Sequence, residues 1–309
     1  MNKKLRVAVL MGGNSSEYEI SIISGREVMV NLPKKFVGIP IVIPKQGNQW
    51  LDKLLKAKPD ICFIAMHGPF GEDGKIQGML DTLGIKYTGS QVAASAIGMD
   101  KILFRKIMKA ENLPIPEYTV VDKKEKKIDL SQLGNPPYFV KPYDQGSSVG
   151  ASIVKRSGNL KKALKLAFKF SDKALIDEYV KGMEVTCGVL GNEDAKALPV
   201  IEIVPKKGEF FDYESKYTES GSDEIVPARI SKRLTKAVQE LSIKVHKTIG
   251  AKGFSRVDFI LRENKYPVIL EINTIPGLTP VSLFPKAAKA YGLSYSELLD
   301  RIIRYSIYE

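Results

Sequence analysis

Two apolar segments near the carboxyl end carry polar side chains at alternate positions. Residues 254–261 hold Arg256 and Asp258, and residues 266–273 hold Glu271 and Asn273. Alternation of polar and apolar residues is typical of a strand that buries one face. We therefore expect an antiparallel hairpin that presents a guanidinium, two carboxylates and an amide together on its other face.

The length of the turn predicts the register of this hairpin. A two-residue turn at Asn264-Lys265 pairs Asp258 with Glu271 and Arg256 with Asn273, and leaves Val257, Phe259, Leu270 and Ile272 together on the core face. Directly opposed carboxylates have Cβ atoms about 5 Å apart and repel each other unless a cation lies between them. Oxygen ligands alone suit Mg²⁺. The alternative is an ion-pair network around Arg256, which leaves the second acid poorly compensated.

A glycine- and serine-rich segment, residues 141–150, could bind an anion. Lys141 ends a predicted strand, and Gly146, Ser147 and Ser148 follow in a loop whose N–H groups and hydroxyls are open to a phosphate. Neither GxxxxGK[ST] nor GxGxxG occurs in the chain. The segment therefore indicates either a phosphate-binding loop of another type or a flexible hairpin loop.

The rest of the chain supplies elements that would position these groups. Residues 1–98 alternate strand and helix patterns, with strands expected at 5–10, 36–43 and 60–66 and helices near 20–32 and 50–57, which predicts an α/β domain with a parallel sheet. A helix over 99–112 follows, ended by two prolines. Residues 99–183 indicate a small α+β domain with strands at 138–141 and 174–179 and a helix capped by Asn159. Residues 184–309 indicate a further α+β domain, with strands at 197–204, 254–261 and 268–273 and helix caps at Ser231 and Ser294.

Composition excludes several classes of protein. The 309 residues are 44% hydrophobic and 27% charged, which is typical of a globular protein and not of a disordered or disulfide-rich chain. Cys62 and Cys187 lie singly in apolar runs and are predicted to be buried thiols. No apolar run approaches membrane-spanning length, so we expect a cytoplasmic protein without a membrane partner. The net charge of +12 is spread along the chain, which favours a solvated surface over a nucleic-acid site.

Seven groups of residues together resemble the D-alanine–D-alanine ligase family of the ATP-grasp superfamily. They are Gly12-Gly-x-Ser-x-Glu17-x-Glu-x-Ser21, His67-Gly-Pro-x-Gly-Glu-Asp-Gly74, Met99-Asp-Lys101, Lys141 with its loop, Lys216-Tyr217, Arg256-x-Asp258, and Glu271-x-Asn273-Thr-x-Pro-Gly277-Leu-Thr. The last two groups indicate only an ATP-grasp enzyme, and the first two narrow the resemblance to this family. The resemblance implies an ATP-grasp fold of an N-terminal Rossmann-like α/β domain, a central α+β domain and a C-terminal α+β domain.

The resemblance also implies an ATP site between the second and third domains. Asp258, Glu271 and Asn273 would hold two Mg²⁺ ions, for which Mn²⁺ is a plausible substitute. Lys101 and Lys141 would contact the phosphates, and the loop of Gly146, Ser147 and Ser148 would close over them. The base and ribose would contact Asp177, Glu178, Tyr179, Val180 and Glu184, and Lys216 would also bind the nucleotide. The family commonly has Glu where this chain has Asp177, which puts a contact from that side chain to the adenine amino group in doubt.

Two molecules of D-alanine are the implied substrates. Glu17 would receive the ammonium of the first, with His67 nearby, and Arg256 and the Gly277 N–H would stabilise the oxyanion. Ser282 and the Leu283 N–H would bind the second carboxylate, Ser147 and Tyr217 would link to Glu17, and residues 208–227 would form a lid. A homodimer is common in such families, but no interface can be read from the sequence.

The alternatives are related enzymes or a different class of protein. A ligase that makes D-alanyl-D-lactate or D-alanyl-D-serine is the nearest; depsipeptide-forming members usually lack the pattern Ser215-Lys216-Tyr217 found here, which favours D-alanine as the second substrate. Another ATP-grasp carboxylate–amine ligase is a second alternative. A nucleic-acid-binding module is disfavoured because basic residues are not interleaved with aromatic ones.

Overall fold

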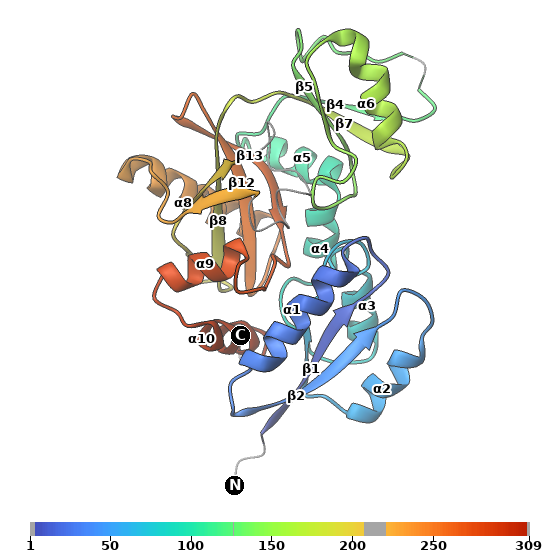
Figure 1. Cartoon of the computed structure of the whole chain (residues 1–309), viewed down its shortest axis with the longest axis vertical. Coiled ribbons are helices and arrows are strands. Elements are labelled where there is room, and N and C mark those ends of the chain that lie inside the picture. The colour runs from blue at the N-terminus through green and yellow to red at the C-terminus, as the bar shows by residue number, and fades with distance from the viewer. Residues whose placement is uncertain (1–3, 126, 207–220, 308–309) are drawn as a thin grey trace.

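The computed structural model describes residues 4–125, 127–206 and 221–307. They form three sheets, stacked along the long axis of the molecule with helices packed against them (Figure 1). Within these residues, no helix is both long enough and apolar enough to cross a membrane.

The N-terminal sheet is parallel, as predicted. Its strands lie in the order β2-β1-β3, with β1 at Leu5–Gly12, β2 at Phe36–Ile43 and β3 at Ile61–Ile64. Helices α1 (Tyr18–Asn31), α2 (Gln49–Ala57) and α3 (Lys75–Thr82) connect and follow them. Strands β1 and β3 are buried along most of their length, which explains their continuous apolar runs, whereas β2, at the edge of the sheet, is partly exposed.

The helix expected at 99–112 begins at Lys101, two residues later than predicted, and a helix that was not predicted ends just before it. Helix α4 covers Val92–Met99 and α5 covers Lys101–Ala110. Asp100 separates them because its backbone is extended (φ −80°, ψ 96°), and its Oδ1 accepts the N–H groups of Ile102 and Leu103 at 2.9 Å. Asp100 is therefore the N-cap of α5, and the helix pattern alone missed this break.

The central sheet is antiparallel, in the order β4-β7-β5-β6. Its strands are β4 (Tyr118–Asp122), β5 (Tyr138–Pro142), β6 (Ser152–Val154) and β7 (Lys173–Glu178), and α6 (Leu160–Ala167) packs on it. The cap expected at Asn159 is wrong. This residue ends a 3₁₀ turn, η1 (Ser157–Asn159), and its backbone is already helical, so its side chain caps nothing.

The C-terminal sheet follows the order β11-β10-β8-β12-β13, with β9 paired to β8. The strands are β8 (Gly182–Leu190), β9 (Lys196–Ala197), β10 (Ile201–Pro205), β11 (Ser222–Ile225), β12 (Phe254–Arg262) and β13 (Tyr266–Asn273). The strand expected at 197–204 is thus two strands. Helix α8 (Lys232–Thr248) is capped by Ser231, and α10 (Tyr295–Ile307) follows a capping box between Ser294 and Glu297, both as predicted. Helix α9 covers Leu283–Ala290.

The hairpin of β12 and β13 confirms the register at its functional end and corrects it near the turn. Asp258 pairs with Glu271 and Arg256 with Asn273, but Phe259 pairs with Ile269 because a bulge interrupts the ladder after Asp258. The two-residue turn is wrong, since Arg262 already pairs with Tyr266 and three residues join the strands. Leu270 consequently leaves the predicted core face and lines a cavity, while Ile269 is fully buried.

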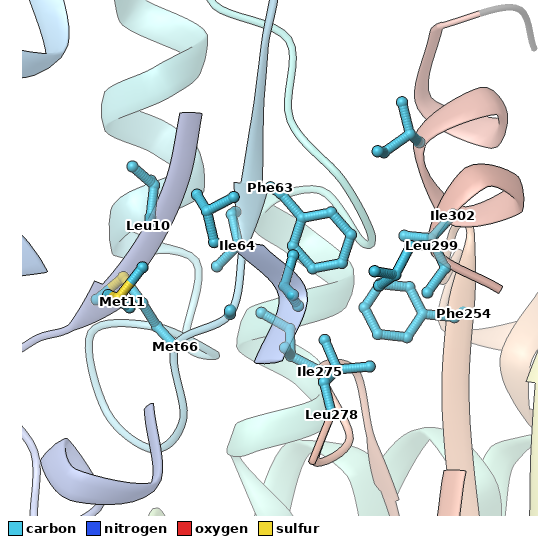
Figure 2. Packing of buried hydrophobic residues seen from close by; sticks show 14 of the residues in the cluster. Leu10, Met11, Phe63, Ile64, Met66, Phe254, Ile275, Leu278, Leu299 and Ile302 are labelled. Carbon is cyan, nitrogen blue, oxygen red and sulfur yellow. The ribbon is translucent and has the colours of Figure 1, made fainter. Parts of the chain in front are cut away.

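One hydrophobic core joins parts of the chain that are far apart in sequence. Leu10, Phe63 and Ile64 of the N-terminal sheet belong to the same cluster as Phe254 and Leu299 (Figure 2). Helix α10 also packs beside α1 (Figure 1). The N-terminal sheet is therefore held against the C-terminal elements by apolar packing, while the central sheet has a separate core.

Three polar or reactive groups predicted to be structural are buried. Cys62 and Cys187 are free thiols with no exposed surface, and burial raises the pKa of each to about 12, so both are neutral. His246 lies on the inner face of α8, as expected of a structural histidine.

Candidate active site

Two cavities meet at one ion pair. The first, of about 560 Å³, is lined mostly by residues of the central and C-terminal parts. The second, of about 630 Å³, is lined mostly by residues of the N-terminal and C-terminal parts, with a contribution from the central part. Lys101 and Glu271 line both cavities, and their charged atoms Nζ and Oε2 are 3.2 Å apart. A molecule in one cavity can therefore approach a molecule in the other at this pair.

The first cavity is lined by most of the residues predicted to bind the nucleotide. They are Lys101, Lys141, Ser148, Asp177, Glu178, Tyr179, Val180, Glu184, Asp258 and Glu271. The N–H of Glu178 already donates to the Glu117 carbonyl at 2.9 Å, which leaves the carbonyl of Glu178 as its backbone group for a base. Three predicted residues, Gly146, Ser147 and Asn273, line the second cavity instead.

A buried charge cluster forms one wall of the first cavity. The Asp177 carboxylate lies 3.0 Å from the Lys141 ammonium and 3.1 Å from the Arg105 guanidinium. Burial alone would raise the pKa of Asp177, but the two cations hold it below its usual value. Burial lowers the pKa of Lys141, and Asp177 opposes that shift. The Asp177 carboxylate therefore binds two cations of the protein.

The predicted metal ligands are oxygen donors held in place by the hairpin. Asp258 accepts hydrogen bonds of 2.8 Å from both Nε and Nη2 of Arg256, and one of 2.5 Å from the Thr186 hydroxyl. The Asn273 side-chain oxygen accepts the N–H of Ile275 at 2.9 Å. The donor set of two opposed carboxylates and an amide fits a hard divalent cation. The same side chains also form the ion pairs expected of the alternative to a metal site. Arg256 pairs with Asp258, and Lys101 pairs with the second acid, Glu271.

The described residues contain no group of three His, Cys, Asp or Glu side chains that could hold a metal ion. The predicted set contains only two such side chains, since its third member is the amide of Asn273. A metal ion at this site would be held by the oxygen donors of the hairpin, and phosphate oxygens would complete its coordination.

Glu17 forms a buried acidic group in the second cavity. It immediately precedes α1, is 5% exposed, and accepts a hydrogen bond of 2.6 Å from the hydroxyl of Ser147 in the glycine- and serine-rich loop. Glycines allow the chain to approach it closely: a Cβ at Gly68 would lie 2.7 Å from Glu17 Oε2, and one at Gly146 would lie 3.0 Å away. The loop of the central part thus reaches across to the N-terminal part at this carboxylate.

His67 lies beside Glu17 in a network of serines and one further acid. Its ring Nε2 is 2.8 Å from the Ser24 hydroxyl, and its ring Nδ1 is 3.5 Å from Glu72. The backbone N–H of His67 donates to the Ser21 hydroxyl. Burial raises the pKa of Glu72, the hydrogen bond from His67 opposes this rise, and the charge of Glu17 adds to it. Glu72 was not among the predicted site residues, although it lies within the motif that begins at His67.

The far end of the second cavity is formed by Gly277, Ser282 and Leu283. A Cβ at Gly277 would lie 2.8 Å from the Ser282 hydroxyl, which itself is 2.8 Å from that of Thr279. Ser282 has an extended backbone and precedes α9, so the Leu283 N–H belongs to the first turn of a helix, where N–H groups attract anions. Lys286, which the sequence analysis missed, also lines this cavity and pairs with Glu224.

Two predicted residues, Lys216 and Tyr217, lie outside the described residues, as does most of the predicted lid at 208–227. All other predicted site residues line one or both cavities.

Comparison with known proteins agrees with this geometry. Residues 107–304 match the family model of the D-ala D-ala ligase C-terminus, and residues 6–58 and 52–90 match that of the N-terminus. The chain is 41% identical to a D-alanine–D-alanine ligase of Pelotomaculum thermopropionicum (98% of this chain, 97% of the relative) and 43% identical to one of Syntrophobacter fumaroxidans (99% and 98%).

Solved structures give the same result. The D-alanine–D-alanine ligase of Bacillus anthracis complexed with ATP is similar, with a TM-score of 0.85 and 36% identity over 98% of this chain and 97% of that chain. The VanG D-Ala:D-Ser ligase of Enterococcus faecalis has a TM-score of 0.84 and 31% identity over 99% and 100%. The predicted ATP-grasp fold is thereby confirmed. With family models that match most of its length and relatives above 40% identity from end to end, the chain belongs to the D-alanine–D-alanine ligase family.

Proposed function

We propose that this protein joins two molecules of D-alanine to form D-alanyl-D-alanine, with ATP converted to ADP and phosphate, as a cytoplasmic step that supplies peptidoglycan precursors. The observation that carries the proposal is the meeting of the two cavities at Lys101 and Glu271. One cavity has the cations and strand backbone suited to a nucleotide, and the other has a buried carboxylate and a helix N-terminus suited to zwitterions.

ATP would occupy the first cavity with its phosphates toward Lys101 and Lys141. Backbone groups of Glu178 and Val180 would contact the base and Glu184 would contact the ribose, since all three residues line this cavity. Asp258, Glu271 and Asn273 would hold Mg²⁺, which when bound neutralises charge on the phosphates.

The first chemical step makes an acyl phosphate. Glu17 would hold the ammonium of the first D-alanine, which orients its carboxylate toward the junction of the cavities. A carboxylate oxygen attacks the γ-phosphorus, the bond to the β–γ bridging oxygen breaks, and ADP leaves. Lys101 and Lys141 would stabilise the charge that develops on the transferred group.

The second step forms the peptide bond. The amine of the second D-alanine loses a proton and attacks the acyl carbon, and the tetrahedral intermediate expels phosphate. Arg256 and the Gly277 N–H would stabilise its oxyanion, while Ser282 and the Leu283 N–H would bind the second carboxylate. Enclosure within a cavity limits hydrolysis of the acyl phosphate by water.

D-Serine is a second candidate for the acceptor. The similarity to the VanG D-Ala:D-Ser ligase supports it, because that protein matches over nearly the same length. The pattern Ser215-Lys216-Tyr217 supports D-alanine rather than D-lactate.

Phosphate release from ATP by the purified protein with Mg²⁺ tests the proposal. It is measured with D-alanine, L-alanine, D-serine, D-alanine plus D-lactate, and no addition, and the products are identified by mass spectrometry. We expect release that depends on D-alanine and a D-alanyl-D-alanine product. Release with none of these compounds would refute the proposed activity, and a mixed product would identify a different acceptor.

A further inference from the structure

Arg105 is a fully buried cation that neither cavity contacts. It lies on α5, one turn after Lys101, and has no exposed surface. Taking a guanidinium out of water is costly unless its hydrogen bonds and charge are satisfied. The groups that contact Arg105 therefore decide how its charge is accommodated.

One partner of Arg105 is also the partner of Lys141. The same oxygen, Asp177 Oδ2, lies 3.1 Å from Nη2 of Arg105 and 3.0 Å from Nζ of Lys141. Lys141 faces the nucleotide cavity and Arg105 lies behind it. If Asp177 had Lys141 as its only cation, that ammonium would be neutralised by a one-to-one ion pair and would attract a phosphate less strongly.

The other partner of Arg105 is the strand that carries Glu271. Nη1 donates at 2.8 Å to the carbonyl of Ile269, two residues before Glu271 and beside the bulge in the hairpin. The N–H of Ile269 donates to Pro114 at 2.8 Å, so both backbone groups of this residue on the sheet edge are bound by the segment around α5. The guanidinium therefore joins α5, β7 and β13.

We propose that Arg105 is a positioning residue for the nucleotide phosphates, an inference that rests on the proposed function. It takes up part of the negative charge of Asp177, so that Lys141 keeps its attraction for phosphate, and it fixes β13 at the point where that strand delivers Glu271. The ion pairs of this region contain three cations, Lys101, Lys141 and Arg105, and two carboxylates, Asp177 and Glu271. Their net charge is positive, and it would be zero without Arg105.

Titration calorimetry with ADP and Mg²⁺ tests this proposal without turnover. The variants are Arg105→Gln, which removes the charge, and Arg105→Lys, which keeps it. Lys106→Gln is the matched control because it removes a cation from the exposed face of the same helix. We expect Arg105→Gln to weaken ADP binding by about tenfold or more, Arg105→Lys to bind within about threefold of wild type, and the control to be unchanged.

A double-mutant cycle separates charge sharing from general disruption. In an Asp177→Asn background the carboxylate that contacts both Lys141 and Arg105 is gone, so Arg105→Gln should then change the Kd by less than about threefold. An equal loss in both backgrounds would overturn the charge-sharing mechanism. Wild-type affinity in Arg105→Gln, with or without a lower melting temperature, would show that Arg105 is only structural.

The remaining outcomes are also decisive. If Arg105→Gln does not fold, Arg105→Lys carries the test, and a loss of tenfold or more in that charge-conserving variant would overturn the proposal. If wild type and Lys106→Gln fail to bind ADP, the proposed function itself fails, which is distinct from a failure confined to the Arg105 variants.

Discussion

Acid should destabilise this protein through His246, one of its two histidines. The ring is buried on α8, and its Nδ1 lies 2.7 Å from the Ser255 hydroxyl. Burial lowers the pKa of His246 from 6.5 to about 4, and the nearby charges of Lys252 and Lys247 act in the same direction. The folded protein therefore holds this ring neutral at a pH where the unfolded chain has it protonated.

The magnitude follows from the two pKa values. A group whose pKa is depressed by folding contributes stability above its unfolded pKa, and that stability is lost as the pH falls toward the folded pKa. Between pH 7 and pH 5 the free energy of unfolding should fall by about 2 kcal/mol on account of this one ring, given 1.36 kcal/mol per pKa unit. The loss should reach about 3 kcal/mol near pH 4.

Urea unfolding of the wild type and of His246→Asn at several pH values measures this loss. Asparagine keeps a polar atom near Nδ1 for Ser255 but does not titrate, and every other ionisable side chain is common to the two proteins. Far-UV circular dichroism is the suitable probe, because the single tryptophan, Trp50, lies in α2 and reports on the N-terminal sheet. The stability difference between the two proteins should shrink by about 2 kcal/mol from pH 7 to pH 5, and parallel curves would refute the reasoning.

Two substitutions test the geometry around the proposed substrates. Gly68→Ala places a Cβ 2.7 Å from the Glu17 carboxylate, so we expect the KM for D-alanine to rise by about tenfold or more. Gly84→Ala is the control, because Gly84 has a similar positive φ but lies in open space; it should cost a comparable ~1 kcal/mol of stability and leave the KM unchanged. The same KM in the two variants would contradict this reasoning. Thr186→Val removes the hydroxyl that donates to Asp258, a charge-assisted hydrogen bond worth about 1.5–3 kcal/mol. The Mg²⁺ concentration that gives half the maximal rate should rise at least about threefold in this variant and stay near the wild-type value in Thr186→Ser. Identical Mg²⁺ curves for the two variants would exclude a role of Thr186 in holding Asp258.

Local patterns predicted much of the fold. The parallel N-terminal sheet, the caps of α8 and α10, and the pairing of Asp258 with Glu271 were all readable from the sequence. Each depends on side chains a few residues apart, or on the strict alternation of faces along a strand. The break at Asp100 and the position of Asn159 were missed because several polar residues near a helix start are equally good caps, and propensity does not choose among them.

The bulge at Leu270 shows where such arithmetic fails. Alternation predicts a core position for Leu270, but one extra residue in β13 turns it toward the first cavity. A bulge leaves no signal in a pattern of period two until the partner strand and its turn are known. The register at the acidic end was nevertheless right, because the three-residue turn and the bulge offset each other there.

The sequence by itself determined the chemistry available to this protein: opposed carboxylates, a loop rich in glycine and serine, and the motifs that resemble one family. Only the tertiary structure decided which charges share a partner. Arg105 is an ordinary helix residue in the sequence, yet folding buries it against Asp177 and the Ile269 carbonyl, 72 and 164 positions away. Contacts across such separations arise when packed sheets bring remote segments together, and no local periodicity records them.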